Sequence, residues 1–142
     1  QMVHNFDTVA TREFYAGPGR WNDPDMLEIG NGDFDGGHLL EARTHLGLWA
    51  IAAAPLMIGT DLSKASPAII DILKAPEVVA INQDPAGHQG VLAYADSDRQ
   101  ILVKTLADGR KAVLLFNRTG AAAKFTLTAE HLKMDAAAPI VY

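Results

Sequence analysis

The residues whose types and spacing favour chemistry lie in one short segment, Gly17-Pro-Gly-Arg-Trp-Asn-Asp-Pro-Asp-Met26. Side chains two apart on a strand face the same way, so Asp23 and Asp25 could present two carboxylates to one cavity. In a parallel α/β fold, such a cavity lies at the carboxyl ends of the strands. Trp21 and Met26 favour a pocket, because a sugar-sized ligand needs an apolar wall beside its polar anchors. The alternative is a turn whose carboxylates accept hydrogen bonds from nearby backbone amides.

Other chemistries find little support in the sequence. The chain has no cysteine, which excludes a thiolate nucleophile, a disulfide and a zinc site built on sulfur. None of its serines lies in the G-x-S-x-G motif of serine hydrolases. A calcium loop starting at Asp33 would need glutamate at its twelfth position, which is Thr44. A D-x-D pair holding the cation of a nucleotide sugar is kept as a minor alternative. The histidines lack metal-ligand spacing, so no metal site is expected.

The charge balance limits the possible partners. The 17 acidic residues outnumber the 12 lysines and arginines, for a net charge of −5, which argues against nucleic acid or an anionic membrane as a partner. No apolar run approaches the roughly 18 residues of a membrane helix. Up to Gly90 the chain has 12 acidic and 5 basic residues, and beyond it 5 acidic and 7 basic ones. We therefore expect the organisation of the chain to change near residue 90.

The first 90 residues show the pattern of alternating strands and helices. Apolar spacing and proline or N-cap signals predict four helices, over residues 1–15, 39–53, 66–73 and 76–81. In the second helix, Glu41 and His45 occupy the side opposite the apolar residues. Strands are expected at Trp21–Ile29 and Leu56–Ile58. This order of strands and helices predicts a parallel sheet.

Beyond Gly90, short runs of alternating residues are typical of an antiparallel β unit. The expected strands cover residues 91–95, 100–106, 111–117 and 124–128. Asp108-Gly109, between the second and the third strand, is a hairpin signal. A further strand is expected at the end of the sequence, up to Tyr142.

Several motifs together resemble one known family. The segment G-P-G-R-W-N-D-P-D-M-L at 17–27 is followed by I-G-N at 29–31, L-W-A-I at 48–51, A-A-P-L at 53–56, D-L at 61–62, S-P at 66–67, I-N-Q-D-P at 81–85 and Q-G at 89–90. In this order and at these separations, over roughly the first 90 residues, the motifs closely resemble the α-galactosidases of glycoside hydrolase family 27.

The resemblance implies a fold of the α/β plus all-β class. The family has a (β/α)8 TIM barrel followed by an antiparallel β-sandwich. Residues 1–87 would be the last strands and helices of the catalytic barrel, with 21–26 as the seventh strand and 56–58 as the eighth. Residues 91–142 would be the start of the β-sandwich. The chain is accordingly expected to be the carboxyl-terminal fragment of a longer protein.

The resemblance also implies an activity, the hydrolysis of terminal α-linked galactose from oligosaccharides or glycoconjugates with retention of configuration and without a metal or other cofactor. One aspartate attacks the anomeric carbon and another acts as acid and then base, the two carboxyl groups lying about 5–5.5 Å apart. In the family both aspartates lie on earlier barrel strands, and their motifs are absent here. No catalytic residue is therefore assigned in this chain, which is expected to be inactive alone.

The same resemblance changes the interpretation of the aspartate pair. Asp25 and Met26 correspond to the wall of the family's substrate pocket, with Asp25 near the galactose ring and Met26 in apolar contact with it. Trp21, Asn22 and Asp23 complete the motif and are expected to support the pocket. The expected partner is a galactose-containing carbohydrate, and neither nucleic acid nor a membrane is expected. The oligomeric state and the cellular compartment stay open.

The sequence leaves three other functions open. An α-N-acetylgalactosaminidase or a β-L-arabinopyranosidase of the same family would share these motifs. The chain does not distinguish these enzymes, because the residues around the 2- and 6-positions of the sugar lie mostly upstream of Gln1. A non-catalytic carbohydrate-binding module is the alternative outside the enzymes. Such a module would need a tryptophan to provide a stacking surface for the sugar. The β unit has no tryptophan, and its aromatic residues are Tyr94, Phe116, Phe125 and Tyr142.

Overall fold

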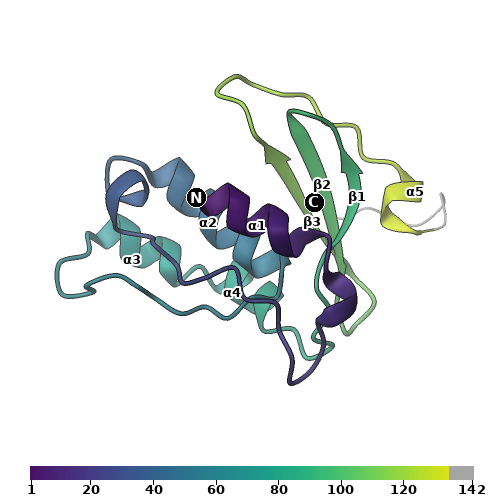
Figure 1. Ribbon diagram of the computed structural model, residues 1–142, viewed down its shortest axis with the longest axis horizontal. Helices are drawn as coiled ribbons and strands as arrows, with labels where there is room; N and C mark the ends of the chain where they lie inside the picture. Colours follow the sequence, from purple (N-terminus) through teal and green to yellow (C-terminus); the bar gives the residue numbers. More distant parts are fainter. Residues whose placement is uncertain (135–142) are drawn as a thin grey trace.

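The computed structural model describes residues 1–134 as a group of helices beside a small sheet (Figure 1). In chain order the elements are α1 (Met2–Ala10), the 3₁₀ turns η1 (Glu13–Tyr15) and η2 (Gly32–Phe34), α2 (Leu39–Ile51), α3 (Pro67–Leu73), α4 (Pro76–Asn82), β1 (Val91–Ala95), β2 (Arg99–Thr105), β3 (Lys111–Asn117) and α5 (Ala129–Leu132). Within these residues, every helix is too short or too polar to cross a membrane.

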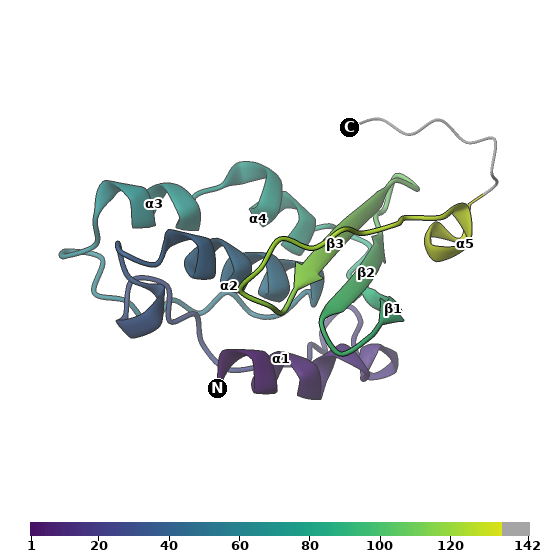
Figure 2. The same cartoon turned by 90° about the horizontal axis from the view of Figure 1, so that it is seen from above.

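Helix α2 forms the centre of the helical part. Figure 2 shows α2 between α1 on one side and the pair α3 and α4 on the other. Its buried residues include His45, which is 1% exposed. The expectation that His45 lies on the polar side of this helix is therefore wrong, because α2 is covered on two sides and by the sheet. The predicted cap of α3 is confirmed, since the Ser66 hydroxyl accepts a hydrogen bond from the Ile69 amide at 3.4 Å.

The first helix is shorter than expected. It ends at Ala10, and the separate turn η1 follows at Glu13–Tyr15. The β-branched residues Thr8, Val9 and Thr11 weaken the helix at this point. Phe14 is consequently 66% exposed and contacts Tyr15 at a tilted angle, with the ring centroids 4.3 Å apart.

The two expected strands of the helical part are reduced to one parallel bridge between Leu27 and Ile58. The Leu27 amide donates to the Met57 carbonyl at 2.7 Å, and the Gly59 amide donates to the Leu27 carbonyl at 3.0 Å. The predicted parallel direction is confirmed, but a strand over Trp21–Ile29 is not formed. Pro24 has no amide hydrogen to donate, and Asp25 has a φ of +87°, so the extended backbone is interrupted there.

The sheet has the order β1-β2-β3 and is antiparallel. The hairpin between β2 and β3 is confirmed, with Gly109 at a φ of +86°. The strand expected at 124–128 is wrong. This segment instead leads into α5, whose first turn forms a reciprocal capping box between Thr128 and His131. The strand expected up to Tyr142 lies outside the described residues.

The hydrophobic core is continuous across the change in composition at Gly90. Phe6 and Val9 of α1 belong to the same buried cluster as Leu102 and Phe116 of the sheet. The rings of Phe6 and Phe116 meet edge to face, with their centroids 6.3 Å apart. The Gly90 amide donates to the Ile51 carbonyl at 2.7 Å. The sheet is therefore packed directly against the helices.

An ion pair also joins α1 to the end of β3. The Arg118 guanidinium donates to both carboxylate oxygens of Asp7, at 2.7 and 2.8 Å, and these hydrogen bonds lower the pKa of Asp7. Lysine cannot reproduce this two-bonded geometry. We expect Arg118→Lys to reduce the free energy of unfolding by about 1 kcal/mol, measured by urea denaturation of the 142-residue chain. Arg110→Lys is the control, because its ion pair with Asp108 is solvent-exposed. Equal losses in the two variants would contradict the prediction.

Candidate functional site

The segment Asp23–Met26 forms a tight turn held by its own carboxylates. The Asp25 amide donates to Oδ1 of Asp23 at 2.9 Å, and the Met26 amide donates to Oδ1 of Asp25 at 2.8 Å. The two carboxylates are therefore not presented side by side from a strand. The turn that the sequence left as an alternative is the observed geometry. This geometry does not remove the segment from a pocket, because Asp25 and Met26 remain exposed.

Two side chains from other elements hold this turn from behind. Asn5 of α1 donates from Nδ2 to the Pro24 carbonyl at 3.1 Å. Trp49 of α2 donates from Nε1 to the Asp25 carbonyl at 2.7 Å. Neither contact follows from the sequence, because Trp49 fits the apolar spacing of its helix and Asn5 lies outside the motifs. The turn is thus fixed to the two helices that lie beneath it.

A hollow of about 350 Å³ opens beside the turn. Asp25 and Met26 line it together with Gln1, with Pro24 and Glu28 of the same segment, and with residues of α1, η2 and α2, namely Met2, Asn5, Asp33, Phe34, His45 and Trp49. Three of these side chains are carboxylates, whereas neither Lys nor Arg is among the described residues that line the hollow. The volume falls within the range of small-molecule sites. The hollow is therefore acidic, partly aromatic and large enough for a monosaccharide.

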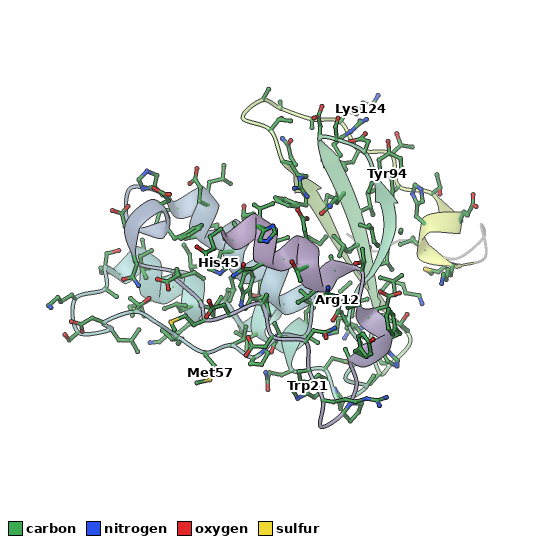
Figure 3. All side chains as sticks on the ribbon, in the orientation of Figure 1. Arg12, Trp21, His45, Met57, Tyr94 and Lys124 are labelled. Atoms are coloured by element: carbon green, nitrogen blue, oxygen red, sulfur yellow. The ribbon has the colours of Figure 1, made fainter. Side chains whose placement is uncertain are left out.

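Met26 lies at the edge of this hollow, with 46% of its surface exposed. A Cβ atom at position 59 would lie 2.5 Å from its sulfur, so Gly59 is needed for the close approach of the two segments. Met57, two positions before Gly59, is 66% exposed. In Figure 3, Met57 and Trp21 project from the same edge of the molecule, whereas His45 lies within it.

The three residues expected to support the pocket lie in different places. Asp23 acts directly on the turn through the Asp25 amide. Asn22 instead donates from Nδ2 to the Arg12 carbonyl at 2.7 Å and to the side chain of Gln89 at 2.8 Å. Trp21 packs near Gly87 and lines a second hollow, of about 410 Å³, between the 18–21 segment and the ends of α2 and α4. Asn22 and Trp21 therefore connect the segment to the chain around residues 87–89.

His45 is the least expected member of the site. Its ring lies between Phe34 and Trp49, at centroid distances of 4.8 and 4.2 Å. Among the described residues, neither ring nitrogen has a hydrogen-bond partner. Burial disfavours the charged ring and lowers the pKa of His45 to about 4. His45 is therefore neutral near pH 7 and contacts the indole that holds the Asp25 carbonyl.

The acidic side chains that the structure describes do not gather into a metal site. Over residues 1–134, no group of three or more His, Cys, Asp or Glu residues has the geometry to hold a metal ion. Asp35 instead accepts a hydrogen bond from the Gly37 amide at 2.8 Å and pairs with Nδ1 of His38 at 2.9 Å. This contact raises the pKa of His38 and lowers that of Asp35.

Comparison with known proteins defines the family. Residues 2–84 match the family model described as alpha galactosidase A, and residues 96–141 match the alpha galactosidase C-terminal beta sandwich domain. These matches place the chain among the glycoside hydrolases. Within that class, the chain belongs to the α-galactosidase family, glycoside hydrolase family 27.

Individual relatives agree with this assignment. The chain is 46% identical over 112 residues to an α-galactosidase of Oryza sativa, covering 79% of this chain and 26% of the rice protein. It is 45% identical over 106 residues to an α-N-acetylgalactosaminidase of Rattus norvegicus, covering 72% and 24%. The crystal structure of α-galactosidase I from Mortierella vinacea superimposes with a TM-score of 0.86 at 31% identity, covering 93% of this chain and 32% of that one. The chain thus spans about a quarter of the length of the sequence relatives.

Proposed function

We propose that this chain is the carboxyl-terminal part of a retaining α-galactosidase that hydrolyses terminal α-linked galactose. Residues 1–87 would end the (β/α)8 barrel, and residues 91–142 would begin the β-sandwich. The observation that carries the proposal is the fixed turn at Asp25 and Met26, which presents a carboxylate and a thioether to one hollow of monosaccharide size. The membership in the α-galactosidase family supports the choice of sugar.

In this proposal Asp25 and Met26 are the residues of this chain that contact the substrate. The Asp25 carboxylate accepts hydrogen bonds from sugar hydroxyls, and the exposed Met26 side chain covers an apolar face of the ring. Asp23 holds the turn through the Asp25 amide at 2.9 Å. Asn22 and Trp21 hold the segment against residues 87–89. The site is therefore one wall of a sugar pocket.

The reacting carboxylates would come from elsewhere in the longer protein. A retaining glycosidase needs a nucleophile and an acid/base carboxyl group about 5–5.5 Å apart. The Asp23 and Asp25 carboxylates instead bind backbone amides inside the turn, which suits residues that bind and hold rather than react. The match to the C-terminal sandwich domain supports a position of this chain in the carboxyl-terminal part of the longer protein. We accordingly assign no catalytic residue to this chain.

The proposal is tested in a rebuilt enzyme, in which residues 1–142 replace the matching segment of the rice α-galactosidase. We expect the rebuilt enzyme to release nitrophenol from nitrophenyl α-galactoside, and the 142-residue chain alone to release none. Asp25→Ala should lower kcat/KM by about tenfold to a hundredfold, because a buried polar contact to the sugar is lost.

Asp71→Ala is the matched control, because Asp71 is an exposed carboxylate on α3. Its kcat/KM should equal that of the unmodified rebuilt enzyme. The thermal melt of Asp71→Ala should coincide with the melt of the parent, whereas Asp25→Ala should melt slightly lower because the Met26 amide loses its carboxylate acceptor. Unaltered kinetics in Asp25→Ala would reduce Asp25 to a turn residue, and turnover by the isolated chain would show that the chain contains its own catalytic pair.

A second candidate is an α-N-acetylgalactosaminidase. The observation that favours it is the 45% identity to the rat enzyme, which nearly equals the 46% identity to the rice α-galactosidase. The two activities differ at the 2-position of the sugar. They are separated by assaying the longer protein that contains this chain on nitrophenyl α-galactoside, nitrophenyl N-acetyl-α-galactosaminide and nitrophenyl β-L-arabinopyranoside. The highest kcat/KM identifies the substrate.

A further inference from the structure

The backbone of Asp25 has a conformation that its own residue type does not favour. Its φ of +87° lies in the region that glycine adopts easily and other residues rarely do. Such a conformation persists where the surroundings determine it, and it is often found at ligand sites. The residues that hold Asp25 in this conformation therefore determine the directions of the Asp25 and Met26 side chains.

Trp49 provides the contact that reaches Asp25 from a distant element. The residue is 1% exposed, and its indole N–H donates to the Asp25 carbonyl at 2.7 Å across 24 positions of sequence. A buried indole N–H usually has a partner. Here the partner is the carbonyl of the residue with positive φ, whose position fixes the peptide plane that joins Asp25 to Met26.

The orientation of the indole is fixed in turn by His45. The two rings meet edge to face with centroids 4.2 Å apart, and the Phe34 ring also contacts His45 with a centroid distance of 4.8 Å. His45 lies within the body of the molecule (Figure 3). The indole consequently has one direction in which to donate its hydrogen bond.

Met26 is held between this contact and the neighbouring segment. Its amide donates to Oδ1 of Asp25 at 2.8 Å, and its sulfur lies against Gly59. The next residue, Leu27, is fixed by hydrogen bonds to the 57–59 segment. If the Asp25 carbonyl moves, the rotation of the 25–26 peptide must therefore displace the Met26 side chain.

We propose that Trp49 is a positioning residue for the sugar contact, which holds the Asp25 carbonyl so that Asp25 and Met26 face the hollow together. This inference rests on the proposed function. Trp49 does not contact the sugar in this scheme, and it acts through the 25–26 peptide. His45 acts one step further away, by holding the indole.

Trp49→Phe in the rebuilt enzyme tests the role, because it keeps an aromatic ring and removes the N–H donor. We expect KM for nitrophenyl α-galactoside to rise about tenfold with a smaller change in kcat, since a binding contact is disturbed. Leu46→Ala is the control. Leu46 is a buried residue of the same helix that does not line the hollow, so its loss should lower the melting temperature and leave KM unaltered.

A second measurement is independent of catalysis. In the 142-residue chain, Trp49→Phe should accelerate hydrogen exchange of the Asp25 and Met26 amides by about tenfold. Both amides are hydrogen-bonded within the turn that the indole N–H holds, and the turn should open more often without it. The Leu102 amide in the sheet should exchange as before. An unaltered KM, or unaltered exchange at Asp25 and Met26, would overturn the positioning role. If the rebuilt enzyme were inactive without any further substitution, that result would instead count against the proposed function.

Discussion

Phe6→Ala is expected to lower the free energy of unfolding of the 142-residue chain by about 3–5 kcal/mol, the usual cost of truncating a buried phenylalanine. Phe6 is 0% exposed and belongs to the core that α1 shares with α2 and the sheet. The substitution removes the edge-to-face contact with Phe116, and the cavity left behind cannot close without moving β3 toward α1. The contact of α1 with the sheet at Phe116 is therefore lost.

The measurement is urea denaturation followed by circular dichroism at constant pH. Phe14→Ala is the matched control, because Phe14 is also a phenylalanine in the first 15 residues but is 66% exposed. We expect its effect to stay within about 0.5 kcal/mol. A small loss for Phe6→Ala, or equal losses for the two variants, would show that α1 does not contribute to the core as the structure indicates.

These two phenylalanines also show what the sequence could predict about the helices. Helix α2, the start of α3 at Ser66 and the β2–β3 hairpin follow from local signals, namely apolar spacing, an N-cap with proline and an Asp-Gly pair. The end of α1 does not follow, because apolar spacing alone places Phe6 and Phe14 on one continuous helix. The separation depends on weak helix formers between them and on the core that only Phe6 can reach.

The location of the candidate site stays a prediction from the sequence, whereas the geometry of its segment could not be predicted. The motif at 21–26 marked the segment, and the family resemblance is confirmed by the matches over 2–84 and 96–141. The expected strand failed because one proline and one residue with positive φ interrupt it. A local pattern does not report φ at Asp25, since that angle is held by Trp49, which is 24 positions away.

His45 is the clearest case of tertiary structure overriding a local pattern. A polar residue opposite the apolar stripe of a helix is expected in solvent. Helix α2, however, is covered by α1 on one side and by α3 and α4 on the other (Figure 2). The ring is therefore enclosed. Because burial disfavours the charged ring, the pKa of His45 is lowered to about 4.

The stability of the fold should consequently fall as the pH is lowered through the range in which unfolded histidine, but not buried His45, takes up a proton. The ordinary pKa is about 6.5, whereas that of His45 in the fold is about 4. The unfolded chain therefore binds more protons than the folded chain between these values. The free energy of unfolding consequently falls as the pH is lowered across this window. Above pH 6.5 the free energy of unfolding is not reduced by protonation of this histidine. By pH 4 it has fallen by about 3 kcal/mol.

His45→Phe isolates this contribution, because phenylalanine keeps an aromatic ring between Phe34 and Trp49 and cannot be protonated. Urea denaturation at several pH values from 7.5 to 4 should show that the difference in stability between His45→Phe and the parent grows by about 3 kcal/mol toward acid. His88→Gln is the control, because it removes an exposed histidine and leaves the buried ring in place. Parallel pH profiles for His45→Phe and the parent would mean that His45 takes up its proton as easily in the fold as in the unfolded chain, in conflict with its burial against Phe34 and Trp49.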